Sequence, residues 1–384
     1  MKIFRSVAAA TLGWAFVTSP AYAIEFCTTT SYELSAALTQ AATLDDDSIA
    51  EIRVVSGIYD GSFMYVSPRA FDATPAVSIS GGWAPGCLVS FGAPSVLTGD
   101  LVFTGPQYST YPLSVSRMVI NGMLATRSDG TFTLRDSTIG GDLSAPCCVG
   151  GVFIERNAVF GSNVLIETST VLGGSSTSVI RNNLFSGHLN EFAWRDLNHS
   201  GSITFRGNTV HFSSSSWPNF RLAILSGDSV STDFRRNLIT TIGYTSVTID
   251  LDGNGNFVIG PKWIEDNWID VPASQITLKP AGLLNDNGNV TAAFDLPYVS
   301  AEPPYDFRLV PGSLQIDYSP PSADDAKDYD IDGFPRVMNG MVDIGAYETF
   351  VDVIFQDGFE QAQQIQTKSA MRRQFWTARP TPKR

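Results

Sequence analysis

The residues best suited to hold a metal ion are three aspartates near the end of the chain. Asp328, Asp330 and Asp332 alternate with other residues and precede a glycine. This spacing opens the oxygen-ligand loops that bind calcium. The bidentate Glu expected at the twelfth position is replaced by Asn339, and a second match that begins at Asp250 lacks it too. We expect calcium to bind the three aspartates and order the C-terminal segment, with an ordinary Asp-rich turn as the alternative.

A second candidate site consists of Arg181, Arg206 and Arg235, which occupy equivalent positions in three copies of a repeat. If neighbouring copies stack as strands about 4.8 Å apart, the three guanidinium groups form an outward stripe. Such a stripe could bind the carboxylates or sulfates of an anionic glycan through bidentate hydrogen bonds. The alternative is that each arginine pairs with nearby acids, such as Asp233 and the flanking glutamates.

Catalysis on a polysaccharide requires carboxylates gathered around the scissile bond. The central acids are instead spread over several repeat units, and they do not map to a single face of the solenoid. They are Asp196, Asp228, Asp233, Asp250 and Asp252. Four tryptophans could stack on sugars or pack inside the fold: Trp194, Trp217, Trp263 and Trp268. We therefore expect a non-catalytic, adhesin-like protein that binds a glycan or surface ligand. The alternative is a polysaccharide lyase or glycoside hydrolase acting on an acidic polysaccharide, without assignable catalytic residues.

The repeat itself predicts the fold. An apolar residue, Arg or Glu, any residue, Asn or Ser, any residue and an apolar residue occur at 134–139, 154–159, 180–185, 205–210, 234–239 and 264–269. Copies that begin 20 to 30 residues apart are typical of stacked architectures. The intervening segments are rich in Ser, Thr, Gly, Val and Ile rather than in helix formers. The sequence thus predicts an all-β right-handed parallel β-helix, in preference to a β-sandwich or a helical solenoid.

Five asparagines recur at the corner of the repeat: Asn157, Asn183, Asn208, Asn237 and Asn267. We expect them to lie in near-vertical register, each bonded to the next in a ladder. Asn also tolerates the left-handed backbone conformation, which predicts that these residues themselves make the sharp turn.

The N-terminus has the order of charges and apolar residues found in a secretory signal peptide. Lys2 and Arg5 precede an apolar run at 7–17, and Ala21-Tyr22-Ala23 matches a cleavage site. The mature chain should begin near residue 24. Thr30 and Glu33 then form a capping box, which predicts a short amphipathic helix that covers the open end of the solenoid.

Charge and composition limit the partners of the protein. The formal net charge is −13, although the last 24 residues contain six basic residues and no acid. The chain before this basic tail is therefore strongly acidic and would repel nucleic acid. No later stretch is long and apolar enough to span a membrane. The oligomeric state cannot be inferred.

Export permits disulfides, and the chain has four cysteines. Cys27 precedes the expected helix and Cys87 follows an early strand, so we expect a bridge between them that pins the cap onto the solenoid. Cys147 and Cys148 are adjacent and could form a strained vicinal bridge or remain free. With three histidines and no CxxC pair, a zinc site is not expected.

Several motifs resemble a known family. Gly57-Ile58-Tyr59 and Gly81-Gly82-Trp83 are similar to the first coils of bacterial pectate-lyase-like β-helix proteins. The stretches 330–336, which reads DIDGFPR, and 342–348, which reads VDIGAYE, resemble the choice-of-anchor Q region of exported bacterial β-helix proteins. The stretch 354–360 resembles a terminal motif of such proteins from Gram-negative bacteria.

The resemblance implies a fold and a destination but no single activity. It places the protein outside the cell, on the outer-membrane surface or in the periplasm of a Gram-negative bacterium. Together with the patterns above, it divides the chain into a signal peptide at 1–23, a cap helix at 24–48, β-helix coils at 49–300, a choice-of-anchor Q-like segment at 301–360 and a basic tail at 361–384. The tail extends beyond the usual end of the family.

Overall fold

The computed structural model describes the residues 22–44, 48–67, 76–90, 92–105, 111–127, 130–149, 151–168, 176–187, 191–196, 200–213, 219–225, 229–242, 246–250, 262–271, 273–279, 288–291, 297–300 and 306–349. The basic tail and all but the last two residues of the expected signal peptide lie outside these ranges. No helix within them is long and apolar enough to cross a membrane.

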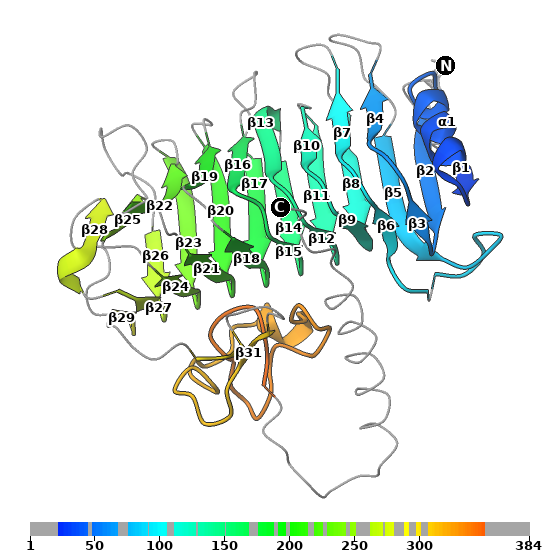
Figure 1. Ribbon diagram of the computed structural model, residues 1–384. Helices are drawn as coiled ribbons and strands as arrows, with labels where there is room; N and C mark the ends of the chain where they lie inside the picture. The colour runs from blue at the N-terminus through cyan, green and yellow to red at the C-terminus, as the bar shows by residue number, and fades with distance from the viewer. Residues whose placement is uncertain are drawn as a thin grey trace, which may run out of the picture.

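The chain forms the predicted right-handed parallel β-helix, in which each full turn adds one strand to each of three parallel sheets (Figure 1). Sheet A contains β1 (Tyr22–Thr28), β2 (Ser48–Val55), β5 (Ala76–Trp83), β8 (Leu113–Ser116), β11 (Thr131–Arg135), β14 (Gly151–Glu155), β17 (Ser176–Arg181), β20 (Ser200–Arg206), β23 (Ser229–Arg235) and β26 (Lys262–Glu265).

The other two sheets complete each turn in the order B, then C. Sheet B contains β3 (Ile58–Tyr59), β6 (Ser95–Leu97), β9 (Met118–Ile120), β12 (Thr138–Ile139), β15 (Ala158–Val159), β18 (Leu184–Gly187), β21 (Thr209–Ser213), β24 (Leu238–Ile242), β27 (Trp268–Asp270) and β29 (Val290–Thr291). Sheet C contains β4 (Phe63–Val66), β7 (Leu101–Thr104), β10 (Leu124–Thr126), β13 (Leu143–Val149), β16 (Asn163–Thr168), β19 (Glu191–Asp196), β22 (Asn219–Leu225), β25 (Ser246–Asp250) and β28 (Ile276–Lys279). A one-turn helix, η1 (Ala273–Gln275), precedes β28.

The core runs along the axis of the solenoid and is filled by every second residue of the strands. In β5 and β11, buried residues alternate with partly exposed or exposed ones, as expected for a sheet with one face turned inward. Inward residues of successive strands stack in register, and the rings of Phe205 and Phe234 lie parallel with their centroids 5.5 Å apart. The hydrophobic core is therefore continuous from coil to coil.

The N-terminal helix forms as predicted, but it is shorter than the region assigned to it. Helix α1 spans Ser31–Ala41, and Thr30 and Glu33 make the expected capping box. The preceding residues instead form β1, which extends sheet A by pairing with β2. The apolar face of α1 is buried against the end of the core. The helix thus covers the core, while β1 continues the sheet.

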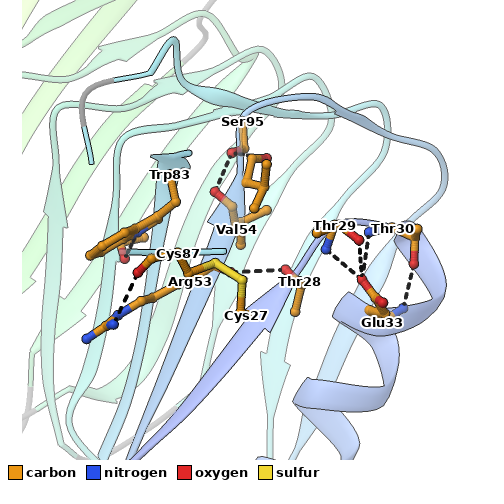
Figure 2. The surroundings of a disulfide bond; sticks show 12 residues. Cys27, Thr28, Thr29, Thr30, Glu33, Arg53, Val54, Trp83, Cys87 and Ser95 are labelled. Atoms are coloured by element: carbon orange, nitrogen blue, oxygen red, sulfur yellow. Dashed lines mark hydrogen bonds between the residues drawn. A yellow bond between two sulfur atoms is a disulfide. The ribbon is translucent and has the colours of Figure 1, made fainter. Parts of the chain in front are cut away.

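The expected bridge between Cys27 and Cys87 is present, with the sulfur atoms 2.10 Å apart (Figure 2). Cys27 lies in β1, and Cys87 lies in the turn that follows β5. Arg53, from the strand between them, donates to the Cys87 carbonyl at 3.3 Å and lies 4.6 Å from the centroid of the Trp83 ring. The side chains of Cys147 and Cys148 are outside the described part of the structure.

The asparagine ladder is confirmed, and it has one more member than predicted. The Nδ2 group of Asn157 donates to Asn183 Oδ1, and the same bond recurs through every later member at 2.9–3.2 Å: Asn183, Asn208, Asn237, Asn267 and Asn289. In the example of Asn208, Nδ2 also donates to the Ile180 carbonyl at 3.0 Å, and Oδ1 accepts from the Asn183 backbone N–H at 3.1 Å. The ladder therefore satisfies buried backbone groups as well as linking the coils.

The prediction that these asparagines adopt the left-handed conformation is wrong. The residue before each ladder position has the positive φ instead: Arg156, Asn182, Gly207, Arg236, Asp266 and Gly288. The ladder side chain must point into the corner to reach the next coil, so the turn is made one residue earlier. The side chain of that earlier residue consequently points outward.

Replacing Asn208 by Ala should lower the free energy of unfolding by about 3 kcal/mol. The buried Asn183 N–H and Ile180 carbonyl would each lose a partner, at a cost of about 1–3 kcal/mol per group. Urea denaturation would measure the loss, with Asn121→Ala, an exposed residue also on the coils, as the control. Equal stabilities of the two variants would show that the ladder is not needed.

Replacing Cys27 and Cys87 together by Ala should destabilise the N-terminal coils by about 4 kcal/mol in the chain-entropy model, because the bridge joins residues 60 apart. In a solenoid, each coil contacts mainly its neighbours. Amide hydrogen exchange should therefore rise in β1 and α1 and remain unchanged in β20 and β23. A uniform rise along the chain would contradict this local role.

Candidate functional site

The C-terminal part of the chain folds back against the coils. We define the clasp as residues 297–300 and 306–349, which contain β30 (Tyr298–Ser300), β31 (Asp306–Leu309) and the short helix η2 (Asp325–Lys327). Figure 1 shows it below the strands of sheet B in the middle of the solenoid. Apolar clasp residues form a second hydrophobic cluster with coil residues such as Leu184, Leu238 and Trp268. The clasp thus covers the outer side of sheet B.

The two C-terminal motifs hold each other inside the clasp. Arg336, which is 2% exposed, donates to the carbonyls of Asp343 and Gly345 at 2.9 Å and pairs with Glu348 at 3.0 Å. The carboxylate of Asp330 accepts from the backbone N–H of Glu348 at 3.0 Å. Burial raises the pKa of Asp330 to about 7. Burial raises the pKa of Glu348 to about 9 as well. The polar side chains of both motifs thus have their partners within the clasp.

Gly345 is the point where the second motif meets the coils. Its N–H donates to the Arg236 carbonyl at 2.9 Å, and the N–H of Ala346 donates to Thr209 Oγ1 at the same distance. Gly345 has a φ of +95°, and a Cβ there would lie 2.6 Å from Thr209 Oγ1. Only glycine can therefore occupy this contact without a shift. The second C-terminal motif, at 342–348, thus docks the clasp onto the coils.

The three arginines of the predicted stripe lie in register, as expected from the repeat. Each has at least one carboxylate partner. Arg181 pairs with Glu155 at 2.7 Å. Arg235 pairs with Asp233 at 2.5 Å. Arg206 is only 5% exposed and lies beneath the clasp. The geometry agrees with the alternative of pairing to acids, and an anionic glycan would have to displace these partners.

A buried ion cluster joins the clasp to the coils, and its central member was not anticipated. Asp325 of the clasp lies 3.2 Å from an Arg206 nitrogen and 2.5 Å from an Arg236 nitrogen. Arg236 also donates to Ser319 Oγ at 2.8 Å. Burial alone would raise the pKa of Asp325, but hydrogen bonds from Ser322 and the two guanidinium groups lower it to about 2. Asp325 is therefore ionised at neutral pH.

The aspartates of the predicted calcium loop face protein groups. Asp328 accepts from Asn182 Nδ2 at 2.7 Å, and an Arg181 nitrogen lies 3.3 Å away. Asp330 is fully buried, whereas Asp332 is partly exposed. Across the ranges that the structure describes, no three His, Cys, Asp or Glu side chains converge to hold a metal ion. Calcium binding by this loop stays a prediction that the geometry does not favour.

The scattered central acids are not brought together. Asp233 lies on sheet A, while Asp250 lies on sheet C and pairs with Arg221 at 3.0 Å. The side chain of Asp196 and all of Asp228 and Asp252 are outside the described residues. Of the tryptophans considered for sugar stacking, Trp194 and Trp268 are buried, Trp263 is 43% exposed and Trp217 is not among the described residues.

The outer face of sheet A carries a feature that sequence reasoning missed. Hydroxyl side chains stand in register on neighbouring strands, in a column formed by Ser78, Ser114 and Thr133. The next strand continues the column with Phe153. A Cβ on Gly151 would lie 3.7 Å from a ring carbon of Phe153, so the ring lies over this glycine.

The same face continues with further hydroxyls toward the C-terminal coils. Thr177 and Ser202 are paired in register, with their oxygens 3.5 Å apart. Thr177 is exposed, and Ser202 and Phe153 are partly exposed. The clasp lies against sheet B rather than this face. A signal was present in the sequence, because Ser or Thr stands four residues before the Arg/Glu position in four copies of the repeat, as Thr131, Thr177, Ser202 and Ser231.

No protein-family model, no curated protein and no solved structure matches this chain. The fold assignment therefore stands on the parallel sheets and the ladder alone. The likeness of the C-terminal motifs to the choice-of-anchor Q region rests on the quoted residues.

Replacing Asp325 by Asn should weaken the clasp most at neutral pH. The pKa is lowered from 3.8 to about 2, so the ionised carboxylate stabilises the fold above about pH 4, and this contribution is lost as the pH falls through 2. The shift corresponds to about 2 kcal/mol. Urea titrations of the parent and variant should differ by at least this amount at pH 7, and the difference should shrink below about pH 4 and come close to zero only below about pH 2. Amide exchange would locate the change in the clasp, and a pH-independent difference would contradict the assignment.

Proposed function

We propose that this protein is an exported, non-catalytic glycan-binding β-helix that presents the outer face of sheet A to its ligand. The observation that carries the proposal is the Phe153 ring lying over Gly151, with Thr133 in register on the preceding strand. On the following strand Val179 is in register with the ring, and the hydroxyls of Thr177 and Ser202 stand two residues earlier along their strands. An aromatic face and hydroxyl groups suit the two kinds of surface on a sugar, its C–H face and its hydroxyls.

The arrangement of the face supports binding of an extended chain rather than a single sugar. Strands of neighbouring coils lie about 4.8 Å apart, so the outward side chains of this face recur at a fixed interval along the solenoid axis. The ladder holds the strands rigidly in place. A rigid array loses little conformational entropy when a ligand binds. We therefore propose a polysaccharide that runs along the axis and contacts several coils.

The charges of the protein favour a ligand with little negative charge on this face. The chain has a net charge of −13, and the arginines nearest to the face are paired with carboxylates. An acidic polysaccharide would therefore meet repulsion and would have to displace these acids. A neutral glycan meets neither obstacle. The secretory signal and the choice-of-anchor Q resemblance support a place outside the cytoplasm, where such glycans occur.

Replacing Phe153 by Ala should weaken binding of a neutral polysaccharide by up to about tenfold, because an aromatic contact contributes about 0.5–1.5 kcal/mol beyond the area that it buries. Affinity electrophoresis against neutral and acidic polysaccharides, with and without calcium, would measure binding. Met64→Ala is the matched control, since Met64 is 58% exposed and lies on sheet C.

Three outcomes would overturn the proposal. Unchanged binding by the Phe153 variant would remove the face from consideration. Equal losses in both variants would show a non-specific effect of apolar surface. Release of new sugar ends by the parent protein would show that it is an enzyme.

A further inference from the structure

The Asp325 carboxylate of the clasp occupies a preformed anion-binding site on the coils. Arg206 and Arg236 lie on successive coils, and each is 5% exposed. Asp325 uses one oxygen for each guanidinium group and also accepts from the backbone N–H and the hydroxyl of Ser322. Two buried guanidinium groups sharing one oxyanion is an arrangement that binds carboxylate, sulfate or phosphate.

The site continues onto the coil before. Arg181 lies next to Arg206 in register, and Asp328 of the clasp is 3.3 Å from an Arg181 nitrogen. Asn182, at the left-handed corner position, holds the same carboxylate through its Nδ2 at 2.7 Å. Carboxylates from one short segment of the clasp thus meet guanidinium groups from three successive coils.

The clasp as a whole has the character of an anionic ligand. Residues 306–349 include nine acids and three basic residues. The coils place Arg181, Arg206 and Arg236 at the corner between sheets A and B, where the clasp lies. The clasp therefore brings strong negative charge to the part of an acidic protein where arginines gather.

We propose that the clasp is a built-in mimic of an acidic glycan, and that its release opens an anion-binding surface formed by Arg181, Arg206 and Arg236. When the clasp is released, these arginines lose their ion pairs with Asp325 and Asp328. The sulfate or carboxylate groups of an acidic glycan could then accept the same hydrogen bonds. This surface begins at the corner edge of the outer face of sheet A, at the opposite ends of β17 and β20 from Thr177 and Ser202, and it binds nothing while the clasp is docked. Acidic glycan binding is thereby conditional on clasp release.

The test compares the parent with a full-length variant that carries Asp325→Asn and Asp328→Asn. The matched control carries Asp306→Asn and Asp324→Asn, which changes the net charge equally at clasp residues that do not pair with the coil arginines. Calorimetry at low salt would measure binding of heparin as a sulfated probe and polygalacturonate as a carboxylated probe. Amide exchange in residues 325–348 would report release.

We expect the Asp325/Asp328 variant to show faster exchange in the clasp and at least tenfold tighter binding than the parent, while the control resembles the parent. Adding Arg206→Gln and Arg236→Gln to the released variant should abolish the gain. Binding of one probe alone would identify the oxyanion that the surface accepts. Equal gains in the control would show that net charge alone is responsible, which overturns the proposal.

A second variant releases the clasp without changing any charge. Gly345→Val places a side chain against Thr209 and should undock the second motif. The proposal requires this variant, too, to bind an acidic probe more tightly. Fast exchange in the clasp without tighter binding would overturn the proposal, and so would tight binding by the parent with its clasp fully protected.

Discussion

The asparagine ladder is the interaction on which the rest of the structure depends. Each member bonds both to the next member and to backbone groups of neighbouring coils, as Asn208 does with Asn183, Asn237 and Ile180. A buried amide that satisfies so many groups fixes the register between coils, because a slip of one residue would leave them all without partners. The outward columns on sheet A, and the outward corner residues that meet the clasp, inherit their alignment from this register.

The corner geometry also explains how the clasp recognises the coils. The ladder residue points inward, so the residue before it takes the left-handed conformation and directs its side chain outward. Arg236 and Asn182 use this position to bind clasp carboxylates. Gly207, at the same position in the coil between them, has no side chain and leaves room for Arg336, to which a Cβ would come within 3.2 Å. The left-handed residue before each ladder asparagine thus either contributes a side chain that binds the clasp or, where it is glycine, leaves room for a clasp side chain.

Sequence patterns predicted the features that depend on repeat spacing and residue type. They did not predict the contacts that form when the clasp packs against the coils. The fold, the capping box at Thr30, the ladder and the Cys27–Cys87 bridge followed from spacing and residue type. The role of Arg236 could not follow, because its partner Asp325 is 89 residues away and approaches only when the clasp packs. The aspartates at 328 and 330 had the spacing of a calcium loop, yet their contacts are with neighbouring protein groups. Spacing alone does not reveal which way a carboxylate faces.

Pairing of charges accounts for how an acidic protein can carry columns of arginine at all. Like charges stacked at strand spacing repel one another unless each is neutralised. Arg235 takes Asp233 of its own strand as a partner, and Arg181 takes Glu155 of the preceding coil. Arg206 and Arg236 instead depend on a carboxylate from the clasp. Removing that carboxylate would leave two buried cations without a counter-charge, which is far more costly than losing an exposed pair. The middle coils and the clasp therefore stabilise each other electrostatically.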